Sequence, residues 1–188
     1  MGIVLTCANS QRLVVKCDGR EKSEHGAVLS ENQLWYTQFS DKCIIGYSGD
    51  KMVCEMLITA LHKALEEQDR SNSFEITEEL QKLLMNTTDT TEDCSFIIAG
   101  IFQGRTHLYG MSYQDHFASI LDKSPIDEDI ICENLIIGSQ ILSSAESFSQ
   151  QYDTKKSIEA NMNGYIRYIS SMDDSVNTNI STCKLKVF

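Results

Sequence analysis

The sequence predicts an α+β fold in which two antiparallel sheets are covered by helices on their outer faces. Short apolar runs typical of strands occur in groups, and these groups are separated by pairs of stretches with the period of amphipathic helices. This grouping differs from the strict strand–helix alternation of a parallel sheet. With 188 residues, the chain is expected to form one domain, 1–188, that buries roughly 70% of its unfolded surface without a metal or disulfide.

The first half of the chain opens with four expected strands. Ile3–Leu5 and Leu13–Val15 are rich in aliphatic and β-branched residues and flank a short polar turn. Leu34–Tyr36 and Cys43–Tyr47 repeat this pattern around a second polar turn. Strands joined by turns this short favour antiparallel hairpins.

Two helices are expected next. From Met52 to Leu65 the apolar residues are spaced alternately by one and three, which predicts an amphipathic helix with Asp50 as its N-cap. A second helix is expected to begin at Thr77, because this capping residue is followed by two glutamates that suit the positive end of a helix. Its apolar positions are Leu80, Leu83 and Leu84.

The second half repeats the order of strands and then helices. Strands are expected at Ser95–Gly100, Thr106–Tyr109 and Glu133–Gly138, whereas 117–121 carries no clear pattern. Ser143 and Glu146 form a capping box that opens a short helix. A longer helix follows near Thr154, and a closing strand or hairpin spans Asn179 to Val187. The apolar face of the longer helix comprises Ile158, Met162, Tyr165, Ile166 and Ile169.

Composition excludes several classes of function. The formal net charge of −11 argues against nucleic acid or an anionic membrane as a main partner. The four histidines lack metal-ligand spacing, and the turn Gly46–Gly49 lacks the Gly-Lys-Ser/Thr sequence of a phosphate-binding loop. No metal or cofactor is therefore expected. The seven cysteines are interpreted as reduced core residues rather than disulfides or a zinc site. They are Cys7, Cys17, Cys43, Cys54, Cys94, Cys132 and Cys183.

No membrane or export segment is expected either. The sequence has no apolar run of transmembrane length and no basic segment typical of a signal peptide. Residues 1–6 match the myristoylation pattern, but no polybasic patch follows to supply a second anchor. A buried strand is therefore the preferred interpretation of 1–6.

Segments spread over nearly the whole chain carry a resemblance to a known family. They are Lys16–Arg20, Ile44–Asp50, the Met52–Leu65 helix, Phe96–Gly100 and Ile136–Ser139. In this order they resemble a proteasome β-type subunit, a member of the N-terminal nucleophile hydrolase superfamily. The resemblance implies a four-layer αββα sandwich of two antiparallel sheets flanked by helices.

The resemblance also implies where catalytic residues should stand. The family nucleophile is an N-terminal threonine, with its own amine as base, sixteen residues before an aspartate that corresponds to Asp18. That position is Gly2, which has no side chain, and the family lysine is missing from 33–38. Ser139 and Asp174 match supporting positions, and Asn177 stands where the family has a serine.

We therefore expect no catalytic residue, with Gly2, Asp18, Ser139 and Asp174 as vestigial positions. A coincidental match of these common residue types is the alternative. Thr6 and Cys7 are unsuitable as replacement nucleophiles, because cleavage there would remove the first strand and leave Cys7 only eleven residues from Asp18.

The expected function is that of a non-catalytic structural subunit of the proteasome core particle, in the cytoplasm and nucleus. The opening residues 1–6 resemble the unprocessed subunit at the fourth position of the β ring. Its partners would be other α- and β-type subunits and unfolded polypeptide in the chamber, during ubiquitin- and ATP-dependent degradation. In that role, the flanking helices should leave apolar groups exposed for subunit contacts. An active or self-assembling proteasome-like threonine peptidase and a free-standing binding domain are the rival interpretations.

Overall fold

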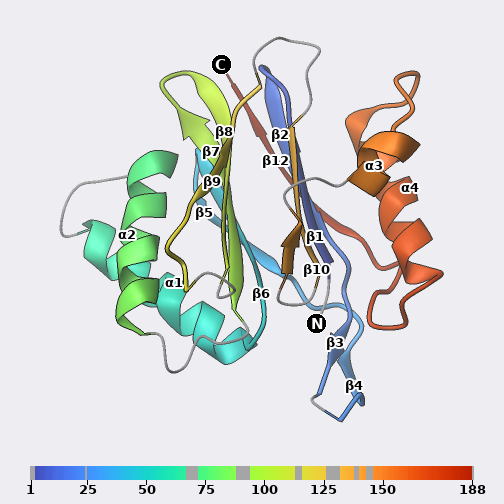
Figure 1. Cartoon of the computed structure of the whole chain (residues 1–188), viewed down its shortest axis with the longest axis horizontal. Coiled ribbons are helices and arrows are strands. Elements are labelled where there is room, and N and C mark those ends of the chain that lie inside the picture. The colour runs from blue at the N-terminus through green and yellow to red at the C-terminus, as the bar shows by residue number, and fades with distance from the viewer. Residues whose placement is uncertain are drawn as a thin grey trace.

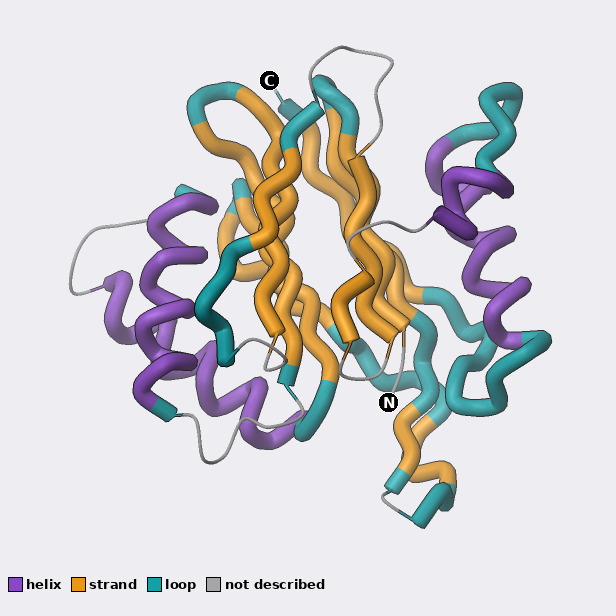
Figure 2. Tube along the Cα trace, viewed as in Figure 1, coloured by secondary structure: helices purple, strands orange, loops and turns teal. Residues whose placement is uncertain are grey.

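The chain folds into four layers, with two sheets packed face to face between two pairs of helices (Figures 1 and 2). The first pair, α1 (Lys51–Glu66) and α2 (Ser73–Asn86), lies outside one sheet. The second pair, α3 (Glu146–Gln151) and α4 (Ile158–Ser170), lies outside the other. The computed structural model describes residues 3–23, 25–66, 72–87, 94–112, 116–125, 132–137, 140–142 and 146–187.

The sheet beneath α3 and α4, called sheet 1, has the strand order β11-β10-β1-β2-β12. All of its neighbouring strands are antiparallel. The hairpin β1–β2 lies at its centre, as the sequence predicts, and the last strand of the chain pairs with β2 at one edge. The strands are β1 (Ile3–Ala8), β2 (Arg12–Cys17), β10 (Cys132–Ile137), β11 (Gln140–Leu142) and β12 (Ser181–Lys186).

The sheet beneath α1 and α2, called sheet 2, runs in chain order from β5 to β9 and is also antiparallel. The β7–β8 hairpin turns at Gln103 and Gly104, whose φ angles of 51° and 74° suit a two-residue turn that matches the strand twist. The strands are β5 (Tyr36–Ser40), β6 (Cys43–Ser48), β7 (Ser95–Phe102), β8 (Arg105–Ser112) and β9 (Leu121–Lys123).

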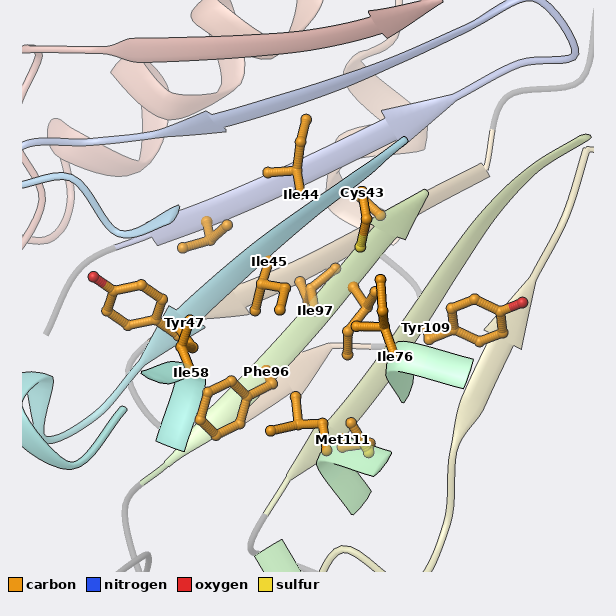
Figure 3. Packing of buried hydrophobic residues seen from close by; sticks show 14 of the residues in the cluster. Cys43, Ile44, Ile45, Tyr47, Ile58, Ile76, Phe96, Ile97, Tyr109 and Met111 are labelled. Carbon is orange, nitrogen blue, oxygen red and sulfur yellow. The ribbon is translucent and has the colours of Figure 1, made fainter. Parts of the chain in front are cut away.

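The hydrophobic core forms two clusters of buried side chains, and sheet 1 separates them. The larger cluster fills the space between the sheets and beneath α1 and α2. Figure 3 shows part of it: along β6, Ile44 points toward sheet 1, whereas Ile45 and Tyr47 lie on the side of the helices. The smaller cluster joins sheet 1 to α3 and α4, and all five predicted apolar positions of α4 are buried in it. Of the cysteines whose side chains are described, five are buried, Cys183 is half-buried, and none forms a disulfide.

The predicted fold class is confirmed, with corrections to several element boundaries. The second helix begins at Ser73 rather than Thr77, the strand expected at 34–36 begins at Tyr36, and the longer C-terminal helix begins at Ile158. Segment 117–121 leads into β9. A short hairpin that the sequence did not reveal, β3 (Glu21–Lys22) with β4 (Val28–Ser30), projects from the body beside the start of β1 (Figure 1). The capping-box residue Ser143 lies outside the described residues.

Asn72 is the N-cap of α2, in place of the expected Thr77. Its side-chain oxygen accepts hydrogen bonds from the amides of Phe74 and Glu75, at 3.1 and 3.0 Å. The Asn72→Ala variant should lose about 1 kcal/mol of unfolding free energy, since the first turn loses its acceptor. Urea denaturation measures this loss, and Asn72→Ser, which keeps an acceptor, should restore most of it. Equal losses in both variants would contradict the assignment of this cap.

Glu159, in the first turn of α4, connects the helix to the edge of sheet 1. Its carboxylate lies 2.9 Å from the Lys184 amine and 3.9 Å from the Arg12 guanidinium. Chiefly because Lys184 donates a hydrogen bond to it, the pKa of Glu159 falls to about 2. At neutral pH this ion pair joins elements far apart in the sequence.

The Glu159→Gln variant should therefore be less stable than the parent chain at pH 7, by up to about 1 kcal/mol for such a partly exposed pair. A carboxyl with a lowered pKa stabilises the fold above its unfolded pKa. The difference between the two chains should thus persist above pH 4.5, shrink on acidification and vanish near pH 2. Thermal unfolding across this range measures it, and a constant difference would show that the ion pair is not its cause.

No helix in the described parts of the chain has the length and apolar character needed to cross a membrane.

Candidate functional site

Asp18 directly follows β2 and is completely buried. One carboxylate oxygen accepts the amide of Ile3 at 2.8 Å, and the other accepts the amides of Arg20 and Asn177, each at 3.0 Å. Burial raises the pKa of the Asp18 carboxyl, while the three amide donors oppose that shift. Both oxygens are thus occupied by main-chain groups, and the carboxylate ties together three separate segments.

Asn177 is brought to Asp18 by the pairing of the last strand with β2. Because Ser181 pairs with Cys17 in antiparallel register, the residues before β12 lie beside the residues after β2. The Asn177 side-chain oxygen accepts the amides of Gly19 and Asn179 at 2.9 and 3.0 Å. Its side-chain nitrogen donates to the carbonyl and the carboxylate of Glu31. Both polar atoms of the Asn177 side chain are therefore hydrogen-bonded within the chain.

Arg20 and Glu31 form the outer part of this network. The Arg20 guanidinium lies 3.1 Å from the Glu31 carboxylate and also donates to the main-chain carbonyl of Asp174 at 2.6 Å. Hydrogen bonds from Asn177 first, and from Arg20 second, lower the pKa of Glu31. The network therefore holds three loops against each other, namely 18–20, 31–33 and 174–179.

Of the other candidate residues, Asp174 lies in the described part of the chain, and its carboxylate does not contact Asp18. The Asp174 carboxylate is 92% exposed and pairs with the Lys22 amine at 2.8 Å, so only its main-chain carbonyl joins the network. Asp174 is one of the vestigial positions that the resemblance implies, and its carboxylate contacts the β3–β4 hairpin through Lys22. Gly2 and Ser139 lie outside the described residues.

Residues 33–38, where the resemblance places the family lysine, contain no lysine and include Trp35 instead. Trp35 is buried and donates its ring nitrogen to the Arg20 carbonyl at 3.2 Å, which packs this segment against the Asp18 loop. A lysine does reach 33–38, but from α1: the Lys51 amine donates to the Gln33 side chain at 2.7 Å. The hydrogen bonds that Asp18 accepts come from three main-chain amides, and none comes from a lysine in the described part of the chain.

Thr6 and Cys7 are poorly placed for nucleophilic attack. Both are completely buried in β1. This strand pairs with β2 on one side and with β10 on the other. A substrate could reach them only if the centre of sheet 1 opened, so neither suits a replacement nucleophile.

An open, polar depression of about 390 Å³ lies beside the network, and Arg20, Glu31, Asn177 and Asn179 contribute to its walls. Within the described residues, no group of histidine, cysteine or carboxylate side chains is arranged to hold a metal ion. Of the charged residues that line it, Arg20 and Glu31 pair with each other, and Asp174 pairs with Lys22. The arrangement is therefore suited to holding loops in place rather than to proton transfer.

Sequence reasoning did not identify Glu31, Lys22 or Asn179 as parts of this network. Glu31 receives two of the side-chain hydrogen bonds of Asn177, and Asn179 donates to the Glu31 carbonyl at 2.9 Å. Glu31 and Asn179 lie in polar loops, and Lys22 lies in the two-residue strand β3, so none of them belongs to a periodic pattern. Apart from the Arg20–Glu31 pair, their contacts join segments more than a hundred positions apart. Asn177 is the one residue of this group of loop residues with a sequence signal, because it stands where the family has a serine.

The fold matches a solved structure, that of eukaryotic HslV from Trypanosoma brucei, with a TM-score of 0.70. The match covers 98% of this chain and 99% of that chain, at 15% sequence identity. No protein-family model and no curated protein sequence matches the chain. The structural comparison shows the fold, which is the four-layer N-terminal nucleophile hydrolase fold that the sequence resemblance implied.

Proposed function

We propose that this chain is a non-catalytic subunit of a proteasome-type protease ring, where it contacts neighbouring α- and β-type subunits and forms part of the chamber wall. The observation that carries the proposal is the hydrogen bonding of the Asp18 carboxylate. Its two oxygens bind three main-chain amides, so the residue that the family resemblance links to catalysis serves here as a structural anchor. The glycine at position 2 has no hydroxyl to act as nucleophile.

The exposed apolar side chains support a role in assembly. Large apolar residues remain exposed on three of the four helical elements or at their ends, and on the projecting hairpin. Apolar side chains left exposed on both sides of the molecule are available for burial in subunit contacts. They include Met52 and Met56 on α1, Phe74 and Met85 on α2, Tyr168 on α4, and Val28 and Leu29 on β4.

Two measurements test this function. The purified chain is incubated with fluorogenic peptides and with an inhibitor that reacts with N-terminal threonine, and its intact mass is then determined. We expect neither turnover nor a covalent adduct, while a catalytic proteasome subunit treated in parallel shows both. Turnover by this chain, or an adduct on it, would favour an active threonine-type peptidase and end the non-catalytic proposal.

Native mass spectrometry of the endogenous protein tests the assembly role separately. We expect the chain in a large complex with proteasome-type subunits. A stable monomer without such partners would favour a free-standing binding domain. A ring made only of this chain would instead favour a self-assembling relative, and the peptide assay would then decide whether that ring is active.

A further inference from the structure

The last strand, β12, leaves one edge of sheet 1 without a partner strand among the described residues. The amide of Val187, directly after β12, donates to the carbonyl of Gln11, directly before β2, at 2.9 Å. Because hydrogen bonding alternates along an antiparallel strand, the main-chain groups of Cys183 and Leu185 also point toward β2. The main-chain groups of Thr182, Lys184 and Lys186 therefore point outward, where an added strand could pair with them.

The side chains along this edge are cationic in a strongly acidic protein. Strands β2 and β12 carry Arg12, Lys16, Lys184 and Lys186 and no acidic residue, although the whole chain has a net charge of −11. Thr182, Lys184 and Lys186 are exposed, whereas Cys183 and Leu185 pack toward sheet 2. The outward main-chain groups and the exposed cationic side chains thus belong to the same residues.

These cations are incompletely neutralised. Glu159 is the carboxylate that the described residues place within ion-pair distance of Arg12 and Lys184. The Lys16 residue is 4% exposed, and its amine donates to the Thr182 hydroxyl at 2.7 Å rather than to a carboxylate. Since Lys16 lies on β2, behind the edge strand, the cationic groups that an approaching segment meets first are the exposed Lys184 and Lys186.

We propose that the free edge of β12 binds an extended, carboxylate-bearing segment of another protein, which adds to sheet 1 as a further antiparallel or parallel strand. Lysines on an edge strand repel a second cationic strand and so prevent β12 from pairing with its own copy. The same lysines attract a strand with carboxylates at every second position, while main-chain hydrogen bonds supply part of the affinity. This inference goes beyond the proposed function, because it requires neither a ring nor the Asp18 network.

The test uses the full chain and a short fluorescein-labelled peptide in which glutamate alternates with valine. Fluorescence polarisation should show saturable binding, and a peptide with lysine in place of glutamate should not bind. Amide hydrogen exchange gives the position of binding. The amides of Thr182, Lys184 and Lys186 should exchange at least about tenfold more slowly when the acidic peptide is present.

Two variants with the same change in net charge provide the control. The Lys184→Glu/Lys186→Glu double variant should bind the acidic peptide at least about tenfold more weakly, because like charges then face each other. The Lys63→Glu/Lys82→Glu double variant changes exposed lysines on α1 and α2 and should bind like the parent chain. Circular dichroism confirms that both variants are folded before binding is compared.

The remaining outcomes overturn the proposal. Equal weakening in both double variants would show a general effect of net charge. Undiminished binding of a peptide methylated at alternate amides would show charge attraction without strand pairing. Protection of the Thr182, Lys184 and Lys186 amides that rises with protein concentration alone would show that a second copy occupies this edge. Native mass spectrometry of the endogenous complex is independent of these results, so failure here leaves the proposed function intact.

Discussion

Replacing Gly19 by alanine is expected to lower the free energy of unfolding by about 3 kcal/mol, because the added methyl group has no room. A Cβ atom at this position would lie 2.3 Å from the Glu31 carbonyl oxygen and 3.1 Å from the Asn32 Cα. Both neighbours are main-chain atoms, so relief requires two loop segments to separate. The amide of Gln33 donates to the Gly19 carbonyl at 2.8 Å, and this separation would break that bond as well.

Urea denaturation followed by the fluorescence of Trp35, the single tryptophan, measures this effect at a nearby buried site. Gly164→Ala is the matched control. Gly164 lies in α4, and a Cβ there meets no atom within 4 Å, so alanine should stabilise the helix by about 0.5–1 kcal/mol. If Gly19→Ala were as stable as the parent chain, the close packing of 18–20 against 31–33 would not hold in solution.

The layers of this fold could be predicted because each depends on a pattern in a short window. The spacing from Met52 to Leu65 and the apolar face from Ile158 to Ile169 each indicate one buried side of a helix, and both helices are present. Boundaries were less accurate, since several residue types can cap a helix. Thr77 has the residue type of an N-cap, but it is buried within α2 and donates to the Ser73 carbonyl, while Asn72 caps the helix.

The candidate site could be predicted only in part, because its contacts join distant segments. Asp18 was found through a local resemblance, yet its bond to the Asn177 amide spans 159 positions and depends on the pairing of β12 with β2. No local pattern specifies that pairing. Asp174, three residues before Asn177, illustrates the limit: it is close in sequence, but its carboxylate points to Lys22.

Replacing Asp18 by asparagine should lower the free energy of unfolding by about 3 kcal/mol, even though the two side chains have almost the same shape. The amide group of asparagine can accept hydrogen bonds at one atom only. Either the Ile3 amide or the amides of Arg20 and Asn177 would then face a nitrogen that donates, and buried donors without acceptors cost about 1–3 kcal/mol each. Denaturation with urea measures the loss.

Asp174→Asn makes the same chemical change at an exposed position and separates the two possible roles of these aspartates. It weakens only the exposed ion pair with Lys22, so the loss should be much smaller than that of Asp18→Asn. If the Asp18 carboxylate did not hold these segments together in solution, both variants would leave stability nearly unchanged. A large loss for Asp18→Asn alone identifies its carboxylate as the structural anchor that joins the start of β1 to the loops 18–20 and 174–179, which is the property that underlies the non-catalytic proposal.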